Sequence, residues 1–268
     1  MYVIGERING MFKDVRAAIQ AKDKKPIQEL ALKQLAACAN ALDINVGPAS
    51  DKPIDAMMWL VEAVREVTNA PLAIDSPKWE VQSAIIPKVT GPKIINSCKS
   101  DESELDRYVD LAVKNNASLI ALCIDEKGVP SDVEKRVELG AMAAGKAMEA
   151  GMTMDRLFID PIIVPVNVAP TSPTVVMEAM RQLQMISNPP PHLVLGLSNV
   201  SQGCKQRHLV NRIYAVMAMS AGMDAFIGDP SDMDLMDAGI TTDMMTGKSI
   251  YCDSFLDAYR MTVRAASK

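Results

Sequence analysis

Short apolar runs alternate along this chain with longer segments whose apolar residues recur at helical spacing. Each run has the length of a buried β-strand and ends in a polar residue that is rarely Lys or His. The eight runs are YVIGER (2–7), ALDIN (41–45), PLAID (71–75), KIIN (93–96), SLIALCID (118–125), LFID (157–160), LVLGLSN (193–199) and AFIGD (225–229). Eight strands separated by helices predict an α/β fold, the (β/α)8 TIM barrel, formed by residues 1–268 as a single domain.

The segments between the runs carry helix starts and ends. Residues 53–67 place apolar side chains on one face, and Pro53 stands where a first-turn proline is tolerated. Ser131–Glu134 form the pattern of a capping box and predict a helix that ends near Gly151. Residues 174–187 also show helical spacing, and the acidic stretch from Ser231 predicts a further helix start. Residues 162–173 predict a long loop, which either shapes a binding site or simply connects two elements.

Charge and composition exclude several classes of protein. The formal net charge is −5 without a basic cluster, which argues against nucleic acid as the main ligand. No apolar run approaches the ~20 residues that span a bilayer, and the N-terminus lacks the pattern of a signal peptide. The five cysteines form no CxxC pair, and the two histidines show no metal-ligand spacing. We therefore expect a cytoplasmic protein with free thiols, no membrane association and no protein-bound metal.

Polar residues at the strand ends are the candidates for function, because a barrel builds its active site from the carboxyl ends of its strands. Asp75, Asn96 and Asp160 end the third, fourth and sixth apolar runs. A carboxylate accepts two parallel N–H bonds from an amino-pyrimidine edge, and an Asn adds one donor and one acceptor. These side chains therefore suit a planar, donor-rich heterocycle. The alternative for Asp75 and Asp160 is a local cap on the turn that follows each strand.

Other chemistries find less support in the chain. No run ends in the Lys of a Schiff-base aldolase, and no Gly-rich phosphate loop follows the seventh run. An aromatic content of 4% supplies few of the platforms on which a glycosidase stacks sugars. Cysteines near strand ends lack a nearby His that would form a thiolate pair. Most of the 19 methionines are expected to pack in the core, and both tryptophans are expected to pack on the exterior of the barrel. The cysteines near strand ends are Cys98, Cys123 and Cys204, the methionines at helical spacing include Met57, Met142, Met148, Met180 and Met217, and the tryptophans are Trp59 and Trp79.

Several motifs give the chain a family resemblance. They are GERING near the N-terminus, LDINVGPA (42–49), the strand ends LAIDS, IINS and FIDP, LGLSNVSQ (195–202) and the ending SIYCDSF (249–255). On these motifs the chain resembles the methyltetrahydrofolate:corrinoid protein methyltransferases over essentially its whole length. That group belongs to the pterin-binding barrels, with dihydropteroate synthase and the folate domain of cobalamin-dependent methionine synthase. Within the group the chain is most similar to the stand-alone enzymes that methylate the corrinoid iron–sulfur protein of the acetyl-CoA pathway.

The resemblance implies a role for individual positions of this chain. Asp75, Asn96 and Asp160 match the residues that hold the pterin edge. Asn199 matches the catalytic Asn that reaches the methyl-bearing nitrogen. The other substrate-binding positions implied are Gly196, where a side chain would obstruct the pterin, Ser198, Gln202, Arg207 beside the benzoyl-glutamate portion of the folate, and Asp43, which with Asn45 extends the polar network.

The implied reaction moves a methyl group between 5-methyltetrahydrofolate and the cobalt of a corrinoid that a partner protein carries. A tertiary amine is a poor leaving group, so the pterin nitrogen must gain a proton, and a neutral Asn stabilises the protonated amine. Asp43 or a water molecule is a candidate for the proton route. The resemblance also implies a homodimer, and the partner is a corrinoid iron–sulfur protein or an O-demethylase corrinoid protein.

Two alternatives remain beside this prediction. A non-catalytic pterin- or folate-binding barrel would conserve the acidic mouth without needing an Asn aimed at the leaving nitrogen. Dihydropteroate synthase is implied less well, because that family uses a Lys near the end of the seventh strand and an Arg after the eighth. The corresponding positions here read Leu197–Ser198–Asn199 and Ile227–Gly228–Asp229.

Overall fold

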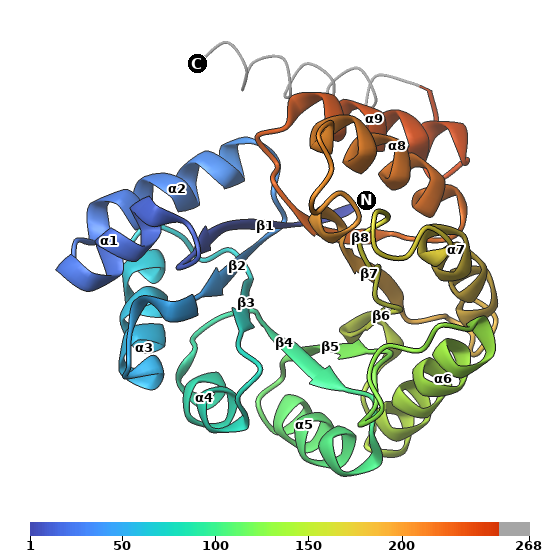
Figure 1. The fold of residues 1–268 in the computed structure, drawn as a ribbon. Helices are drawn as coiled ribbons and strands as arrows, with labels where there is room; N and C mark the ends of the chain where they lie inside the picture. The colour runs from blue at the N-terminus through green and yellow to red at the C-terminus, as the bar shows by residue number, and fades with distance from the viewer. Residues whose placement is uncertain (252–268) are drawn as a thin grey trace.

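The computed structural model describes residues 1–251, and this part of the chain forms a closed barrel of parallel strands (Figure 1). The strands pair in sequence order from β1 to β8, and β8 closes the ring by pairing with β1. They are β1 (Tyr2–Asn9), β2 (Ala41–Asn45), β3 (Leu72–Asp75), β4 (Lys93–Lys99), β5 (Ser118–Leu122), β6 (Leu157–Asp160), β7 (His192–Gly196) and β8 (Ala225–Gly228). Each apolar run contains one strand, and the predicted (β/α)8 fold is confirmed.

Helices form a ring around the barrel (Figure 1). They are α1 (Lys13–Ala21), α2 (Lys24–Ala36), α3 (Pro53–Arg65), α4 (Trp79–Ile85), α5 (Glu102–Lys114), α6 (Val133–Glu149), α7 (Ser172–Leu183), α8 (Arg207–Ser220) and α9 (Met233–Met245). Four 3₁₀ turns join them in the described part, namely η1 (Gly47–Ala49), η2 (Ile86–Lys88), η3 (Met154–Arg156) and η4 (Leu197–Asn199). The last of these turns follows β7 at the mouth of the barrel.

Capping residues explain where the helix boundaries differ from the sequence prediction. The N-cap of α6 is Asp132, whose carboxylate accepts a hydrogen bond from the Lys135 amide at 2.8 Å. The predicted capping box on Ser131 is therefore wrong, because the acidic side chain one residue later takes that role. Helix α7 begins two residues earlier than predicted, because Pro173 occupies its first turn, where a proline is tolerated.

Four strands also differ by two residues or more in length from the apolar runs that predicted them. Strand β1 continues past Arg7 to Asn9. Strand β4 continues past Asn96 to Lys99, so Asn96 lies within the strand instead of ending it. Strand β5 ends at Leu122, before the polar end of its run. Strand β7 ends at Gly196, and the next three residues of its run form the turn η4. Asp75 and Asp160 end their strands as predicted.

One layer of buried side chains fills the interior of the barrel below the mouth. Because side chains alternate along a strand, the residue two positions further on each strand points inward again, closer to the mouth. The filled layer consists of Ile4, Ala41, Ala73, Ile94, Ile120, Phe158, Val194 and Ala225. The next inward positions are Glu6, Asp43, Asp75, Asn96, Leu122, Asp160, Gly196 and Ile227. An apolar floor thus carries a mainly polar layer.

The prediction of buried methionines holds for some positions only. Met57 and Met180 are buried in the core, whereas Met148 and Met217 expose 50% and 42% of their surface. Both exposed residues lie on outer helices beside apolar neighbours, and helical spacing alone did not tell which face turns inward. Within residues 1–251 no helix is long and apolar enough to cross a membrane. Residues 252–255 of the SIYCDSF motif, including Cys252, lie outside the described residues.

Candidate active site

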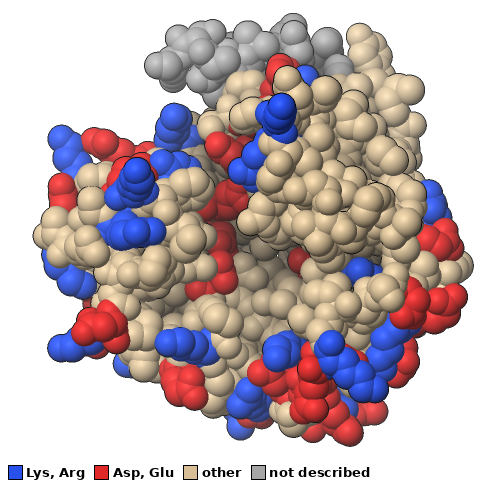
Figure 2. All heavy atoms as spheres, viewed as in Figure 1, with Lys and Arg blue, Asp and Glu red and all other residues tan. Residues whose placement is uncertain are grey.

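The polar layer lines a cavity of about 230 Å³ at the carboxyl ends of the strands. Figure 2 shows a hollow at the centre of the ring, with acidic side chains along its wall. The cavity is lined by Glu6, Asn9, Asp43, Asp75, Asn96, Asp160, Gly196, Ser198, Asn199 and Ile227. The fold therefore brings together most of the site residues that the sequence predicted, and it adds Glu6 and Asn9 to them.

Two pairs of hydrogen-bonded side chains connect strands on one wall of the cavity, the first between the neighbours β2 and β3 and the second between β2 and β4. Asn45 Nδ2 donates to Asp75 Oδ2 at 2.5 Å, and Asn96 Nδ2 donates to Asp43 Oδ1 at 2.9 Å. Asp75 therefore bonds across to β2 in the first of these pairs. Because Asn96 uses one N–H of its amide within the protein, its carbonyl oxygen and its second N–H are the groups left to face a ligand.

Burial controls the charge of this wall. Asp43 is only 2% exposed, and this burial, together with the negative charge of Asp75, raises its pKa well above the ordinary value. Burial also raises the pKa of Asp75, while the hydrogen bond from Asn45 acts against the rise. Two neighbouring carboxyl groups in a dry site do not both ionise readily. The pair is therefore built to share a proton.

Asp160 lies on the opposite side of the cavity, at the end of β6. Its Oδ1 accepts a hydrogen bond from the Ile162 amide at 2.7 Å, so it does make the local contact expected of a capping residue. Burial raises its pKa to about 6, against the opposing effect of backbone amides and the charge of Arg136. Arg136 itself is buried and donates to the carbonyl oxygens of Pro161 and Ile162. Asp160 combines the capping role with a place in the cavity wall.

Asn199 differs from these residues because it is exposed to solvent at the rim. It is the last residue of η4, and its amide lies against Gly196, since an added Cβ on Gly196 would meet Asn199 Nδ2 at 2.9 Å. A side chain at Gly196 would therefore displace Asn199 before it obstructed a ligand. The glycine keeps the floor beneath this amide open.

The remaining predicted residues have separate surroundings. Ser198 lines the cavity, and its hydroxyl donates to Glu6 Oε1 at 2.7 Å. Arg207, in the first turn of α8, donates to the Ser198 carbonyl oxygen at 3.0 Å and to Ser201 Oγ at 3.2 Å. Gln202 is exposed and does not line this cavity. The structure thus groups Ser198 and Arg207 around the turn, and Gln202 contacts the same turn through its backbone, since its amide donates to the Asn199 carbonyl oxygen at 3.1 Å.

A family model described as "Pterin binding enzyme" matches residues 9–229, which include most of the barrel and every residue that lines the cavity except Glu6. This chain belongs to the pterin-binding enzyme family. It is 31% identical to the methylcorrinoid:tetrahydrofolate methyltransferase of Eubacterium limosum, over 97% of this chain and 96% of that one. It is also 26% identical to the methionine synthase of Mycobacterium leprae, over 84% of this chain but only 20% of that longer protein.

Solved structures of dihydropteroate synthases share the fold of this pterin-binding enzyme. The enzyme from Coxiella burnetii, solved in complex with pteroic acid, gives a TM-score of 0.68 at 14% identity, covering 92% of this chain and 94% of that one. A Yersinia pestis enzyme gives 0.65 at 16% identity, with the same two coverages. Identity at this level shows the common barrel architecture and does not extend to the reaction.

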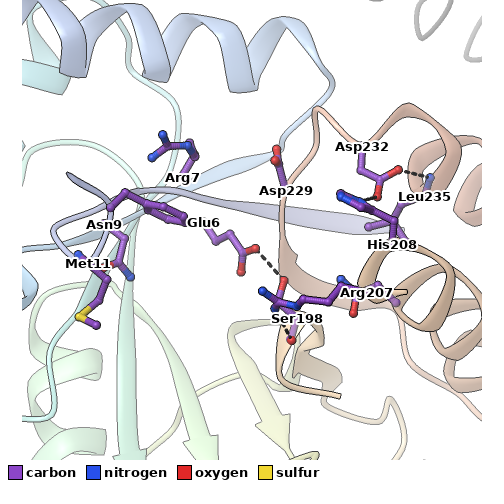
Figure 3. Close-up of a pocket in the computed structure, with 12 residues that line it drawn as sticks. Glu6, Arg7, Asn9, Met11, Ser198, Arg207, His208, Asp229, Asp232 and Leu235 are labelled. Atoms are coloured by element: carbon purple, nitrogen blue, oxygen red, sulfur yellow. Dashed lines mark hydrogen bonds and ion pairs between the residues drawn. The ribbon is translucent and has the colours of Figure 1, made fainter. Parts of the chain in front are cut away.

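A second cavity of about 420 Å³ adjoins the first in this pterin-binding enzyme (Figure 3). The two cavities share Glu6, Asn9 and Ser198 as lining residues. Sequence reasoning quoted the GERING motif but did not assign Glu6 to the site. The available signal was its register, because Glu6 stands two positions after the inward-facing Ile4 on β1.

Two cysteines of this pterin-binding enzyme, Cys98 and Cys123, are poorly suited to act as nucleophiles in their present surroundings. Cys98 and Cys123 are fully buried, and burial raises the pKa of both thiols far above the ordinary value. Among residues 1–251, no group of three or more His, Cys, Asp or Glu residues has the arrangement of a metal site. The polar side chains that line the cavity carry carboxyl, amide and hydroxyl groups.

Proposed function

We propose that this chain transfers a methyl group between 5-methyltetrahydrofolate and the cobalt of a corrinoid protein. Support comes from its similarity, over nearly the whole chain, to a methylcorrinoid:tetrahydrofolate methyltransferase. The observation that carries the proposal is the placement of Asn199, an exposed amide on a turn at the rim of a carboxylate-lined cavity. A barrel that merely held a pterin would not need that amide.

The cavity wall suits the donor-rich edge of a pterin. We assign the ionised carboxylate of Asp160 to paired N–H groups of that edge, because a carboxylate accepts two parallel hydrogen bonds. Asp75 supplies a second acceptor on the other wall, and Asn96 presents its carbonyl oxygen and the second N–H of its amide, since the first N–H is bound to Asp43. The cavity of about 230 Å³ has room for a flat heterocycle and leaves the benzoyl-glutamate portion outside.

Asn199 acts on the leaving group in this proposal. Methyl transfer from a tertiary amine requires the pterin nitrogen to carry a proton, which makes the tetrahydrofolate product a better leaving group. The side-chain oxygen of Asn199 accepts the hydrogen bond of that N–H, and the bond strengthens as positive charge develops. The corrinoid, a substrate that the partner protein carries, supplies the nucleophilic cobalt.

Asp43 is our candidate for the route of the proton. It lies beneath the mouth with a raised pKa, beside Asp75 and within the hydrogen-bonded wall. A carboxyl group whose pKa is raised holds its proton more firmly than an ordinary one and can release it toward a substrate nitrogen, directly or through one water molecule. Asp75 and Asn96 hold that carboxyl in place while it does so.

A spectroscopic assay tests the proposed function. Cobalt(I) cobalamin, and separately a corrinoid protein, is mixed with 5-methyltetrahydrofolate and the purified chain, and the absorbance change from cobalt(I) to methylcobalt is followed. We expect the change only with the chain present. Folate binding without any absorbance change in either reaction would identify the chain as a non-catalytic pterin-binding barrel.

The assembly and the partner are further parts of the proposal. We propose a homodimer, and a sedimentation experiment that finds only monomer at micromolar concentration would contradict it. We propose a corrinoid protein as the partner, of either the iron–sulfur or the O-demethylase type. A pull-down with the two types, scored by methyl transfer to each, tells them apart.

A further inference from the structure

Asn199 depends on its turn for its position. No described residue forms a hydrogen bond with its side-chain amide, so the backbone of η4 determines where that amide lies. The amide also rests close against Gly196, as the short distance to an added Cβ shows. Any shift of the turn therefore moves the amide relative to the cavity.

The turn is held from two sides. On one side the Ser198 hydroxyl donates to Glu6 Oε1 at 2.7 Å. On the other side Arg207 donates to the Ser198 carbonyl oxygen and to the hydroxyl of the buried Ser201. Figure 3 shows the Glu6 carboxylate and the Arg207 guanidinium approaching Ser198 from β1 and α8. Ser198 is thus the residue at which the two contacts meet, directly before Asn199.

The Glu6 contact ties together parts of the barrel that are far apart in the sequence. Glu6 lies on β1, and β8 separates that strand from β7 in the ring. Its carboxylate is part of the wall of both cavities, and the bond to Ser198 joins residues 192 positions apart. A hydrogen bond to a carboxylate is stronger than one between neutral groups, so it fixes the turn more firmly.

We propose that Glu6 and Ser198 are positioning residues for methyl transfer, because their hydrogen bond holds the turn that aims Asn199 at the substrate. This inference rests on the function proposed above. Ser198 and Arg207 then act on the substrate through the turn, since the Ser198 hydroxyl and the Nε and Nη2 atoms of Arg207 donate within the protein. Neither the family match nor the similarity to the methyltransferase assigns this role to Glu6.

Single-turnover kinetics test the proposal with Ser198→Ala. We expect methyl transfer to slow by about 10- to 100-fold, because displacement of a catalytic group by about 1 Å is costly. We expect the dissociation constant of 5-methyltetrahydrofolate to stay within about 2-fold, since the pterin anchors lie on other strands. Ser198→Thr keeps a hydroxyl and should restore the rate. Ser220→Ala, which removes a hydroxyl hydrogen bond on the outer helix α8, serves as the control.

A double-mutant cycle separates positioning from a general structural effect. In an Asn199→Ala background, Ser198→Ala should slow the reaction by no more than about 2-fold, because the group being positioned is gone. A loss as large as in the parent would overturn the proposal. A Ser198→Ala variant that weakens folate binding at an unchanged transfer rate would overturn it as well.

Glu6 variants test whether its carboxylate positions the turn or exchanges a proton. Glu6→Gln keeps an acceptor oxygen for the Ser198 hydroxyl, whereas Glu6→Met removes it. Positioning predicts that Glu6→Gln retains most of the transfer rate and Glu6→Met loses it. Equal losses in both variants would contradict the proposal. An inactive parent chain would count against the proposed function. If the parent chain is active and the Ser198→Ala variant transfers methyl groups at the parent rate, only the positioning role is contradicted.

Discussion

Asn199 and the carboxyl groups of the cavity have opposite surroundings, and this difference separates their roles. The carboxyl groups of Asp43 and Asp160 are buried, and burial raises their pKa values. Loss of a hydrogen bond between such a buried group and an N–H of the ligand is costly, because it leaves a polar group without a partner. Asn199 is exposed before a ligand binds and becomes desolvated when one covers it. The carboxyl groups are therefore suited to holding the substrate, and Asn199 is suited to responding to charge that develops during the reaction.

Replacement of Asn199 tests its part in the reaction. In the proposed mechanism, Asn199→Ala removes one hydrogen bond that strengthens as the pterin nitrogen gains its proton. We expect a loss on the order of 2–4 kcal/mol in the transition state, or ~10²–10³ in single-turnover rate. Asn115→Ala, which removes an amide at the end of α5, should transfer methyl groups at the parent rate. A parent-like rate for Asn199→Ala would contradict the assigned mechanism without affecting the fold.

Asp160 should control binding more than rate. Asp160→Asn or Asp75→Asn places an amide donor against a donor of the pterin edge, which should weaken 5-methyltetrahydrofolate binding by roughly 1–3 kcal/mol. In the parent, affinity should also fall as pH decreases through about 6, because protonation of Asp160 removes an acceptor. Titrations at several pH values measure both effects. An Asp160→Asn variant that keeps the decrease near pH 6 would assign that titration to another group.

At the scale of elements, the turns after the strands decide which side chains reach the mouth. The turn after β6 shows this dependence clearly. Ile162 adopts a φ of +60° there, and its amide is the donor that Asp160 Oδ1 accepts. Arg136 reaches from α6 to the carbonyl oxygens of Pro161 and Ile162, and it is buried between the helix and the strand. The helix therefore fixes the turn, and the turn fixes the carboxylate.

Arg136→Met should weaken both the fold and the site. It leaves two backbone carbonyl oxygens without their donor, each at a cost of about 1–3 kcal/mol if water does not reach them. We expect a lower free energy of unfolding in urea, together with weaker binding of 5-methyltetrahydrofolate. Arg156→Met is the matched control, because Arg156 donates to the carbonyl oxygens of Ala112 and Ala117 near the start of β5. Arg156→Met should lower the free energy of unfolding and leave folate binding unchanged. A loss of folate affinity in Arg156→Met would contradict the assignment of Arg136 to the site.

At the scale of the whole molecule, the site is built at the expense of stability. Burial raises the pKa values of Glu6, Asp43, Asp75 and Asp160, so in the folded protein their charged forms are disfavoured. An acid whose pKa is raised in the folded protein does not lower stability at pH values below its ordinary pKa. It lowers the free energy of unfolding most at pH values above its folded pKa. For Asp160, a folded pKa of about 6 against the ordinary 3.8 corresponds to a cost of about 3 kcal/mol at neutral pH.

The melting temperature of the ligand-free protein should therefore rise as pH is lowered from about 7 toward 4, because the cost at Asp160 disappears between its folded pKa of about 6 and its ordinary value of 3.8. His192 acts in the same direction, because its bond to Asp224 raises its pKa and the stabilisation disappears as pH increases through that raised value. Below about 4 the trend should reverse, since Asp14, Glu66 and Glu178 have lowered pKa values and lose their contribution on protonation.

Asp160→Asn tests the source of this trend. It should raise the melting temperature at pH 8 more than at pH 5, because the amide removes a charge that the folded state disfavours. Calorimetry of the ligand-free parent and variant provides the comparison. A parent that is most stable at pH 8, or a variant that is destabilised equally at both pH values, would contradict the assignment of the cost to Asp160.

The sequence by itself determined the barrel and much of its active face. Short apolar runs with helices between them leave few folds open, and Asp75 and Asp160 end their strands where the runs predicted. The alternation of side chains also turns Asp43 and Glu6 inward, although only Asp43 was recognised from the motifs. These features are local, because strand length and inward register are set by residues within a few positions of one another.

Only the tertiary structure decided which polar atoms meet. Asn96 uses its nitrogen on Asp43, Ser198 bonds to Glu6 across the closure of the ring, and Arg136 holds the turn that orients Asp160. Each of these contacts joins residues from different strands or helices, so no spacing along the chain encodes it. The same holds for Met148 and Met217, whose helical spacing is apolar but whose exposure depends on which face packs on the barrel. Closure of the ring brings distant residues within hydrogen-bonding distance, and that closure is a property of all eight strands together.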